Sequence, residues 1–223
     1  MMTLILAHAI FAGGRSIVGD GGHLTGLRKR RRDGDVSVNK LGIEGDEIVD
    51  RRNHGGPDRA LNLFSFEHYG ILQTLFPEAA EPLIAGSMGE NITSKGLLDQ
   101  CLYIGDIYRV GTVVFQISQP RSPCWKLNDR FGIAPFSKVL QEQHRTGCYA
   151  RVLAGGTMCR GQTIELQARS KHTCSIASFW AFVLASKPDL EVLSELAKIE
   201  GLAEGWHTSL MGRIKWLHER SLR

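Results

Sequence analysis

The sequence lacks any long hydrophobic run, and no apolar segment approaches the roughly 20 residues that a membrane-spanning helix requires. Its start, through Ala7-His8-Ala9, superficially resembles a signal peptide. It lacks a positively charged first region, however, and its apolar stretch is too short, so a first strand is expected there. With 43% hydrophobic and 22% charged residues, the composition is that of an ordinary globular protein.

The cysteines form no recognisable framework. The five cysteines include no C-x-x-C pair, so the sequence contains neither a thiol–disulfide motif nor a zinc ribbon. A chain of 223 residues is also long enough to fold around a core without disulfides. We therefore expect reduced thiols and a cytoplasmic protein.

Four common catalytic motifs are also missing. The sequence contains no G-x-x-x-x-G-K-[ST], no G-x-G-x-x-G, no H-E-x-x-H and no G-x-S-x-G. These absences exclude the simplest forms of an NTPase, a dinucleotide-binding enzyme, a zinc protease and an α/β-hydrolase.

Positive charge is concentrated in one place. The net charge of +4 comes from the run Arg28 to Arg32, without which acidic and basic residues nearly balance. No aromatic residues interleave this run, so a nucleic-acid partner is not expected. The simplest interpretation of the run is a solvent-exposed strand and turn.

Short β-branched and aromatic segments, separated by glycine, aspartate, asparagine or proline, dominate the chain up to about residue 165. They predict strands over 3–11, 36–38, 60–66, 104–110, 112–118, 149–153 and 163–167. Helical spacing predicts two helices, over 65–76 and 135–143. This pattern is typical of a barrel or sandwich rather than a doubly wound sheet.

The pattern of apolar residues changes after about Arg169, where three segments have helical spacing. They lie over 176–186, 190–197 and 206–217. The sequence therefore predicts a mainly β fold with some α: a β domain over 1–169, either a barrel or a sandwich, and a small three-helix subdomain over 170–223. No spacing of cysteine, histidine or carboxylate residues in the tail indicates a metal site, so we expect no metal ligand from it.

Three polar clusters carry the candidate chemistry. The first contains Gly42–Asp46 and His54–Ala60, the second is Gly89–Ile92, and the third is Gln119–Leu127. A histidine beside two glycines and a proline indicates a tight loop, where backbone N–H groups could bind an anion. An ordinary turn with a hydrogen-bonded histidine is the alternative.

Cys124 stands out in the third cluster. It follows an expected strand on a loop stiffened by two prolines, between Arg121 and Lys126. Neighbouring cations favour the thiolate form of a cysteine, which is the nucleophilic and metal-binding form. A buried structural cysteine is the alternative. The other four cysteines are expected to be inert packing residues.

In order along the chain, these clusters and the late Gly161–Leu166 segment resemble the pattern of MOSC domains, named for the C-terminal domain of molybdenum cofactor sulfurase. The run Ser-Gln-Pro-Arg-Ser-Pro-Cys and the three-helix tail are most similar to the YiiM-like subgroup. The resemblance is poorest before Val38, although Lys29 aligns with a basic position of the family.

The resemblance implies a pseudo-barrel β fold that binds a pyranopterin molybdenum cofactor, with Cys124 as the metal ligand. Enzymes of the family reduce N-hydroxylated compounds, including hydroxylamino purines, with electrons from a separate flavoprotein. We therefore expect a small N-hydroxylated substrate and a flavoprotein partner. A homodimer stays open, and pyridoxal phosphate is not expected as a cofactor.

The residue chemistry agrees with this implication. Soft thiolates suit metals such as molybdenum, and the cofactor phosphate needs cations and backbone donors. The candidate cofactor-binding residues are Lys29, Gly55, Gly56, Arg59, Asn91, Arg121 and Lys126. The candidate catalytic residues are Cys124 and His54. His54 would either deliver a proton or orient the Cys124 loop. The basic run could alternatively form a lip for the cofactor phosphate or a docking patch for an acidic electron donor.

Two other functions remain open at this stage. One is a non-catalytic MOSC module that binds the cofactor or transfers it, or sulfur, to a partner. The other is a thiol hydrolase or transferase that uses Cys124 and His54 without a metal.

Overall fold

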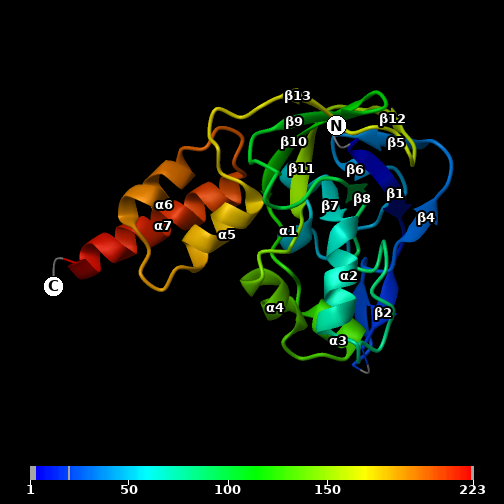
Figure 1. The fold of residues 1–223 in the computed structure, drawn as a ribbon, viewed down its shortest axis with the longest axis horizontal. Helices are drawn as coiled ribbons and strands as arrows, with labels where there is room; N and C mark the ends of the chain where they lie inside the picture. Colours follow the sequence, from blue (N-terminus) through cyan, green and yellow to red (C-terminus); the bar gives the residue numbers. More distant parts are fainter. Residues whose placement is uncertain (1–3, 20, 222–223) are drawn as a thin grey trace.

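A curled eight-stranded sheet forms the centre of the protein, in a computed structural model that describes residues 4–19 and 21–221 (Figure 1). Its strands are β1 (Leu6–Ala12), β4 (Arg30–Arg32), β7 (Leu61–Ser65), β8 (Ile92–Lys95), β9 (Ile107–Val110), β10 (Val113–Pro120), β11 (Cys148–Ala154) and β13 (Glu165–Ala168). Their order is β13-β9-β10-β11-β7-β8-β1-β4. Neighbouring strands are antiparallel except β7 and β8, which run parallel.

Backbone contacts tie the β13 end of this sheet to β1. Leu6 forms an antiparallel bridge with Thr163, just before β13. The Ala7 N–H donates to the Gln162 carbonyl at 2.9 Å, and the Gly161 N–H donates to the Ala7 carbonyl at 2.7 Å. The sheet therefore curls round on itself, and the expected mainly β pseudo-barrel is confirmed.

Two smaller sheets complete the β structure. One contains β12 (Gly156–Met158), β5 (Val36–Asn39) and β6 (Gly42–Ile43), and the other contains β2 (Ser16–Val18) and β3 (His23–Thr25). Arg30–Arg32 of the basic run form the exposed edge strand β4, as expected of a solvated strand. Within the basic run Lys29 is the exception, because its side chain is buried.

Short helices fill the connections between the strands. They are α1 (Arg51–His54), the 3-10 turn η1 (Pro57–Arg59), α2 (Phe66–Leu75), α3 (Lys126–Phe131) and α4 (Phe136–Glu142). Helices α2, α3 and α4 share a second hydrophobic core, in which Phe131 and Phe136 are fully buried. This packing supports α3, the helix that begins immediately after the Cys124 loop.

The tail forms the three expected helices, α5 (Ile176–Leu184), α6 (Leu190–Ala197) and α7 (Glu204–Ser221). We call residues 176–221 the helical unit and the described residues up to 168 the β body. Figure 1 shows the helical unit beside the β body. Phe179 and Trp180 are at most 1% exposed and belong to the main barrel core. The Trp180 indole donates to Thr146 Oγ1 at 2.9 Å, so the two regions share one interior.

The sequence pattern did not predict α1, α3 or β8. Helix α1 is only four residues long, and α3 begins just after a proline-rich loop. Strand β8 pairs with β1 and β7, which are both distant from it in the sequence. The expected first strand starts at Thr3, which lies outside the described residues. None of the helices described here is long and apolar enough to cross a membrane.

Candidate active site

Two adjoining pockets lie beside helix α1 and the loop that carries Cys124. Six residues line both pockets: Asp50, His54, Arg59, Cys124, Lys126 and Tyr149. The inner pocket, of ≈ 80 Å³, extends toward Lys29 and Asp46. The outer chamber, of ≈ 570 Å³, extends toward the first turns of α7. Cys124 therefore lies at the border between a narrow charged space and a wider one.

The Cys124 loop is held at both ends. At its start, the Arg121 N–H donates to the Gly147 carbonyl at 3.1 Å. At its end, the Leu127 N–H donates to the Cys124 carbonyl at 2.9 Å, which begins the turn into α3. Cys124 itself is half-buried and free, so its thiol is held at a fixed place in the pocket wall without being sealed in the core.

Arg121, Lys126 and Arg59 are cations that lack a carboxylate partner. Among the described residues, none of the three forms an ion pair with an aspartate or glutamate. They donate instead to backbone carbonyls: Arg121 Nη2 to Met88 at 2.6 Å, Lys126 Nζ to Leu24 at 2.7 Å and Arg59 Nη1 to Gly55 at 3.4 Å.

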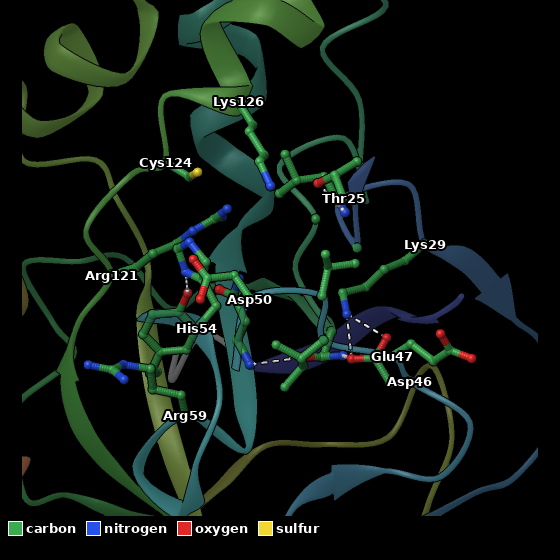
Figure 2. A pocket seen from close by; sticks show the side chains of 18 residues that line it. Thr25, Lys29, Asp46, Glu47, Asp50, His54, Arg59, Arg121, Cys124 and Lys126 are labelled. Atoms are coloured by element: carbon green, nitrogen blue, oxygen red, sulfur yellow. Dashed lines mark hydrogen bonds and ion pairs between the residues drawn. The ribbon is translucent and has the colours of Figure 1, made fainter. Parts of the chain in front are cut away.

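Arg121 is the most informative of these cations, because it is only 4% exposed. A buried guanidinium without a compensating charge is costly. The arrangement therefore favours an anion supplied from outside the chain. Figure 2 shows Arg121 and Lys126 on the same side of the inner pocket as the Cys124 sulfur.

Lys29, unlike these three cations, has a carboxylate partner. It lies across the inner pocket in an ion pair with Asp46, and both side chains are more than nine-tenths buried (Figure 2). Burial lowers the pKa of Lys29, against the opposing effect of Asp46. The structure thus places Lys29 in the predicted pocket with its charge already compensated by the protein.

Asn91 completes this network. Its Nδ2 donates to Asp46 Oδ2 at 2.8 Å and to the Phe11 carbonyl at 3.2 Å, and its Oδ1 accepts from the Asn62 N–H at 3.0 Å. Asn91 therefore lines the pocket with a side chain that is fully engaged in holding the wall together. Asn62, which also lines the pocket, has a buried Oδ1 without a hydrogen-bond partner among the described residues.

His54 ends helix α1 rather than lying on an irregular loop. Burial, followed by the positive charge of Arg121, lowers its pKa from 6.5 to about 4. Its Nδ1 lies 3.3 Å from Tyr149 Oη, which also hydrogen-bonds Arg121. Since Arg121 can only donate, the Tyr149 hydroxyl can donate to His54 Nδ1, which leaves Nε2–H as the remaining donor of a neutral imidazole. At neutral pH this favours the orienting role over delivery of a proton from an imidazolium.

The predicted anion-binding turn at Gly55 and Gly56 is not brought to either pocket. The Gly55 N–H instead donates to the Arg51 carbonyl at 3.2 Å and closes helix α1. The structure adds residues that the sequence pattern did not indicate: Asn62, Tyr149, Gly205, Trp206 and Ser209. It also brings to the outer chamber Gln119, a member of the third polar cluster to which the sequence pattern assigned no role. Tyr149 could have been found from strand pairing, because it is the register partner of Gln119 at the end of β10.

The acidic side chains and the thiol that line the pockets, Asp46, Glu47, Asp50 and Cys124, form no metal-binding cluster. No group of three or more histidine, cysteine, aspartate or glutamate side chains within residues 4–19 and 21–221 is arranged to hold a metal ion. Cys124 is thus the thiol available to a metal that brings its other ligands with it.

Comparison with known proteins gives the family of the chain. The family model described as MOSC domain matches residues 50–165, which include His54, Arg59 and the whole Cys124 loop. The chain is 36% identical over 193 residues to protein YiiM of Escherichia coli strain K12, covering 86% of this chain and 85% of YiiM. The chain belongs to the MOSC domain family.

Further similarity supports the YiiM-like subgroup. The crystal structure of YiiM from Escherichia coli matches with a TM-score of 0.78 and 30% identity, covering 93% of this chain and 91% of that one. A protein named reductase from Gibberella moniliformis is 33% identical over 181 residues, which are 80% of this chain but only 32% of the fungal protein. The MOSC domain family indicates a role related to the molybdenum cofactor.

Proposed function

We propose that this MOSC protein binds a pyranopterin molybdenum cofactor and uses it to reduce N-hydroxylated compounds. The observation that carries the proposal is Arg121, a buried and uncompensated cation three residues before a free, half-buried Cys124 in the same pocket. A soft thiol beside a set of unpaired cations is the donor set that a sulfur-ligated metal on an anionic carrier requires.

The residues fit such a cofactor in separable roles. Cys124 would ligate the metal, and Arg121, Lys126 and Arg59 would hold the anionic groups. The orphaned Oδ1 of Asn62 offers an acceptor for a donor on the pterin. Lys29 and Asn91, bound to Asp46, would shape the wall rather than supply free charge.

Reduction of an N–OH group to N–H takes up two electrons and two protons and releases one water molecule. When bound, the molybdenum cofactor supplies the redox change and accepts the oxygen. The residues of the chain would bind the cofactor and orient it. Neutral His54 and Tyr149 would orient Arg121 through a hydrogen-bond chain. We expect the electrons to come from a separate flavoprotein.

The test begins with the protein loaded with molybdenum cofactor, whose metal and pterin contents are measured. Turnover is then followed with benzamidoxime, a small N-hydroxylated compound, and reduced methyl viologen as the artificial electron donor. We expect turnover by the wild type and by Cys101→Ser, which alters an exposed cysteine outside both pockets. Cys124→Ser should abolish turnover without loss of fold, because a serine hydroxyl is a hard and poorly ionised ligand.

The other outcomes discriminate between functions. Tight cofactor binding without turnover of any N-hydroxylated compound would favour a module that carries or transfers the cofactor. Full activity of the Cys124→Ser protein at normal molybdenum content would remove Cys124 from the mechanism. Turnover that depends on Cys124 but needs no metal would point to a thiol enzyme.

A further inference from the structure

The outer chamber differs from the inner pocket in charge. The residues that line only the inner pocket include Lys29, Asp46, Glu47 and Arg121. The residues that line only the outer chamber are all formally uncharged: Asn53, Gln119, Ser122, Pro123, Trp125, Gly205, Trp206 and Ser209. The charged residues of the outer chamber, Asp50, Arg59 and Lys126, are all shared with the inner pocket, so the far side of this ≈ 570 Å³ space is uncharged and suits the neutral part of an organic molecule.

Gln119 is the residue of the chamber wall that most clearly indicates a ligand. It is the second-last residue of β10, is only 3% exposed and lines the chamber. Its buried Oε1 has no hydrogen-bond partner within the described part of the chain. A buried amide left unsatisfied is costly, so a native one calls for a partner that the protein alone does not supply.

The helical unit closes the far side of the same chamber. Trp206 and Ser209 project from the first two turns of α7, and Gly205 lies close to the Arg59 guanidinium, with an added Cβ only 3.9 Å from Nη2. The Trp206 ring is fixed by edge contacts with Phe179 at 4.9 Å and Trp180 at 5.5 Å. This wall is therefore rigid, and it belongs to a part of the chain without any catalytic motif.

We propose that the outer chamber is the substrate subsite, where the Gln119 amide binds the polar edge of a planar amidine-like or amide-like N-hydroxylated group and α7 limits the size of the remainder. An amide side chain presents a donor and an acceptor side by side, which complements the paired acceptor and donor of such a group. Gln119 and Ser209 would then determine specificity. This inference rests on the proposed reduction of N-hydroxylated compounds.

The test compares matched variants of the cofactor-loaded protein. Gln119→Leu removes the orphaned amide, whereas Gln116→Leu removes an amide on the same strand whose atoms bond Gly105 and Arg151. Ser209→Trp fills the chamber from an exposed position, and Ser209→Ala is its control. For each variant we would measure molybdenum and pterin content, thermal stability, KM and kcat for benzamidoxime, and the Kd of benzamidoxime by equilibrium dialysis.

We expect Gln119→Leu to raise KM and Kd about 10–100-fold, the effect of two lost hydrogen bonds, while thermal stability and cofactor content stay the same or rise. Gln116→Leu should lower stability without changing KM. Ser209→Trp should raise KM and Kd at least as much as Gln119→Leu, and Ser209→Ala should change neither.

Several results would overturn the subsite. One is loss of cofactor from Gln119→Leu or Ser209→Trp, which would assign the chamber to the cofactor. Another is that the wild type turns over benzamidoxime while KM and Kd are the same in Gln119→Leu and Ser209→Trp as in the wild type. That result would refute the subsite and leave the proposed function unaffected. Binding of benzamidoxime that the variants weaken, without turnover by any form, would sink the proposed function and keep the subsite. No binding to the loaded wild type would refute both.

Discussion

The β body and the helical unit contribute different chemistry to the same pair of pockets. The β body supplies Cys124 and every charged side chain that lines them. The helical unit supplies only Gly205, Trp206 and Ser209, all of them uncharged. We propose that this difference separates two tasks in space: the charges of the β body would hold an anionic cofactor, whereas the uncharged wall from α7 would limit which substrates reach it.

This division depends on the helical unit being a fixed part of the fold. Its largest buried side chain, Trp180, is 1% exposed and donates a hydrogen bond to Thr146 in the β body. Trp180→Ala should therefore destabilise the protein by about 3–5 kcal/mol, the usual range for deleting a buried tryptophan. Chemical denaturation followed by circular dichroism would measure the change.

Trp216→Ala provides the control, because Trp216 is on α7 but 52% exposed. It should cost less than about 1 kcal/mol. If Trp180→Ala cost no more than Trp216→Ala, the helical unit would be a loosely attached appendage and could not form a rigid wall.

The next comparison tests the charges of the β body. Arg121→Ala should weaken retention of the molybdenum cofactor about 10–100-fold, as expected for lost hydrogen bonds to a charged group, with little change in the stability of the cofactor-free protein. The small effect on stability is expected because Arg121 has no carboxylate partner among the described residues. Dialysis of the loaded protein with metal and pterin analysis would measure retention.

Arg169→Ala should give the opposite result. Arg169 pairs with Asp106, which is fully buried, at 2.9 Å, and it lines neither pocket. Its removal should cost about 1–3 kcal/mol of stability and leave cofactor retention unchanged. The charge argument fails if Arg121→Ala behaves like Arg169→Ala.

The smallest expected effect concerns His54 and pH. Its pKa is lowered from 6.5 to about 4 in the folded protein, so between these values the unfolded chain binds more protons. The stability contributed by neutral His54 is present above pH 6.5 and is lost as the pH falls toward 4. From pH 7 to 4.5 the cofactor-free wild type should lose about 2 kcal/mol more than His54→Gln.

His207→Gln, which changes an exposed histidine on α7, is the matched control and should keep the wild-type pH profile. A His54→Gln profile parallel to that of the wild type would show that His54 is not held neutral by its surroundings.

The sequence predicts the parts of the site that lie close together along the chain. Cys124 and its flanking cations are separated by at most three positions, and prolines restrict the loop that carries them. The strand segments were also predictable, because β-branched residues and turn residues alternate locally. These signals led to the correct family and fold class.

The rest depends on contacts between distant segments. The compensation of Lys29 by Asp46 spans 17 positions, and Asn91 joins them from 45 positions beyond Asp46. Closure of the sheet joins Leu6 to Thr163. The wall from α7 depends on how the tail packs, and the short helix α1 uses the Gly55 N–H that the sequence pattern assigned to an anion. Tertiary packing, which local patterns do not encode, decided each of these features.

The central claim is that Cys124 ligates molybdenum in a pocket built from the β body. The most direct measurement is X-ray absorption at the molybdenum edge on the cofactor-loaded wild type and on Cys124→Ser with equal metal content. With two sulfurs from the cofactor dithiolene and one from the protein, the account predicts one fewer sulfur ligand at the metal in Cys124→Ser. An identical sulfur count in the two proteins would contradict it.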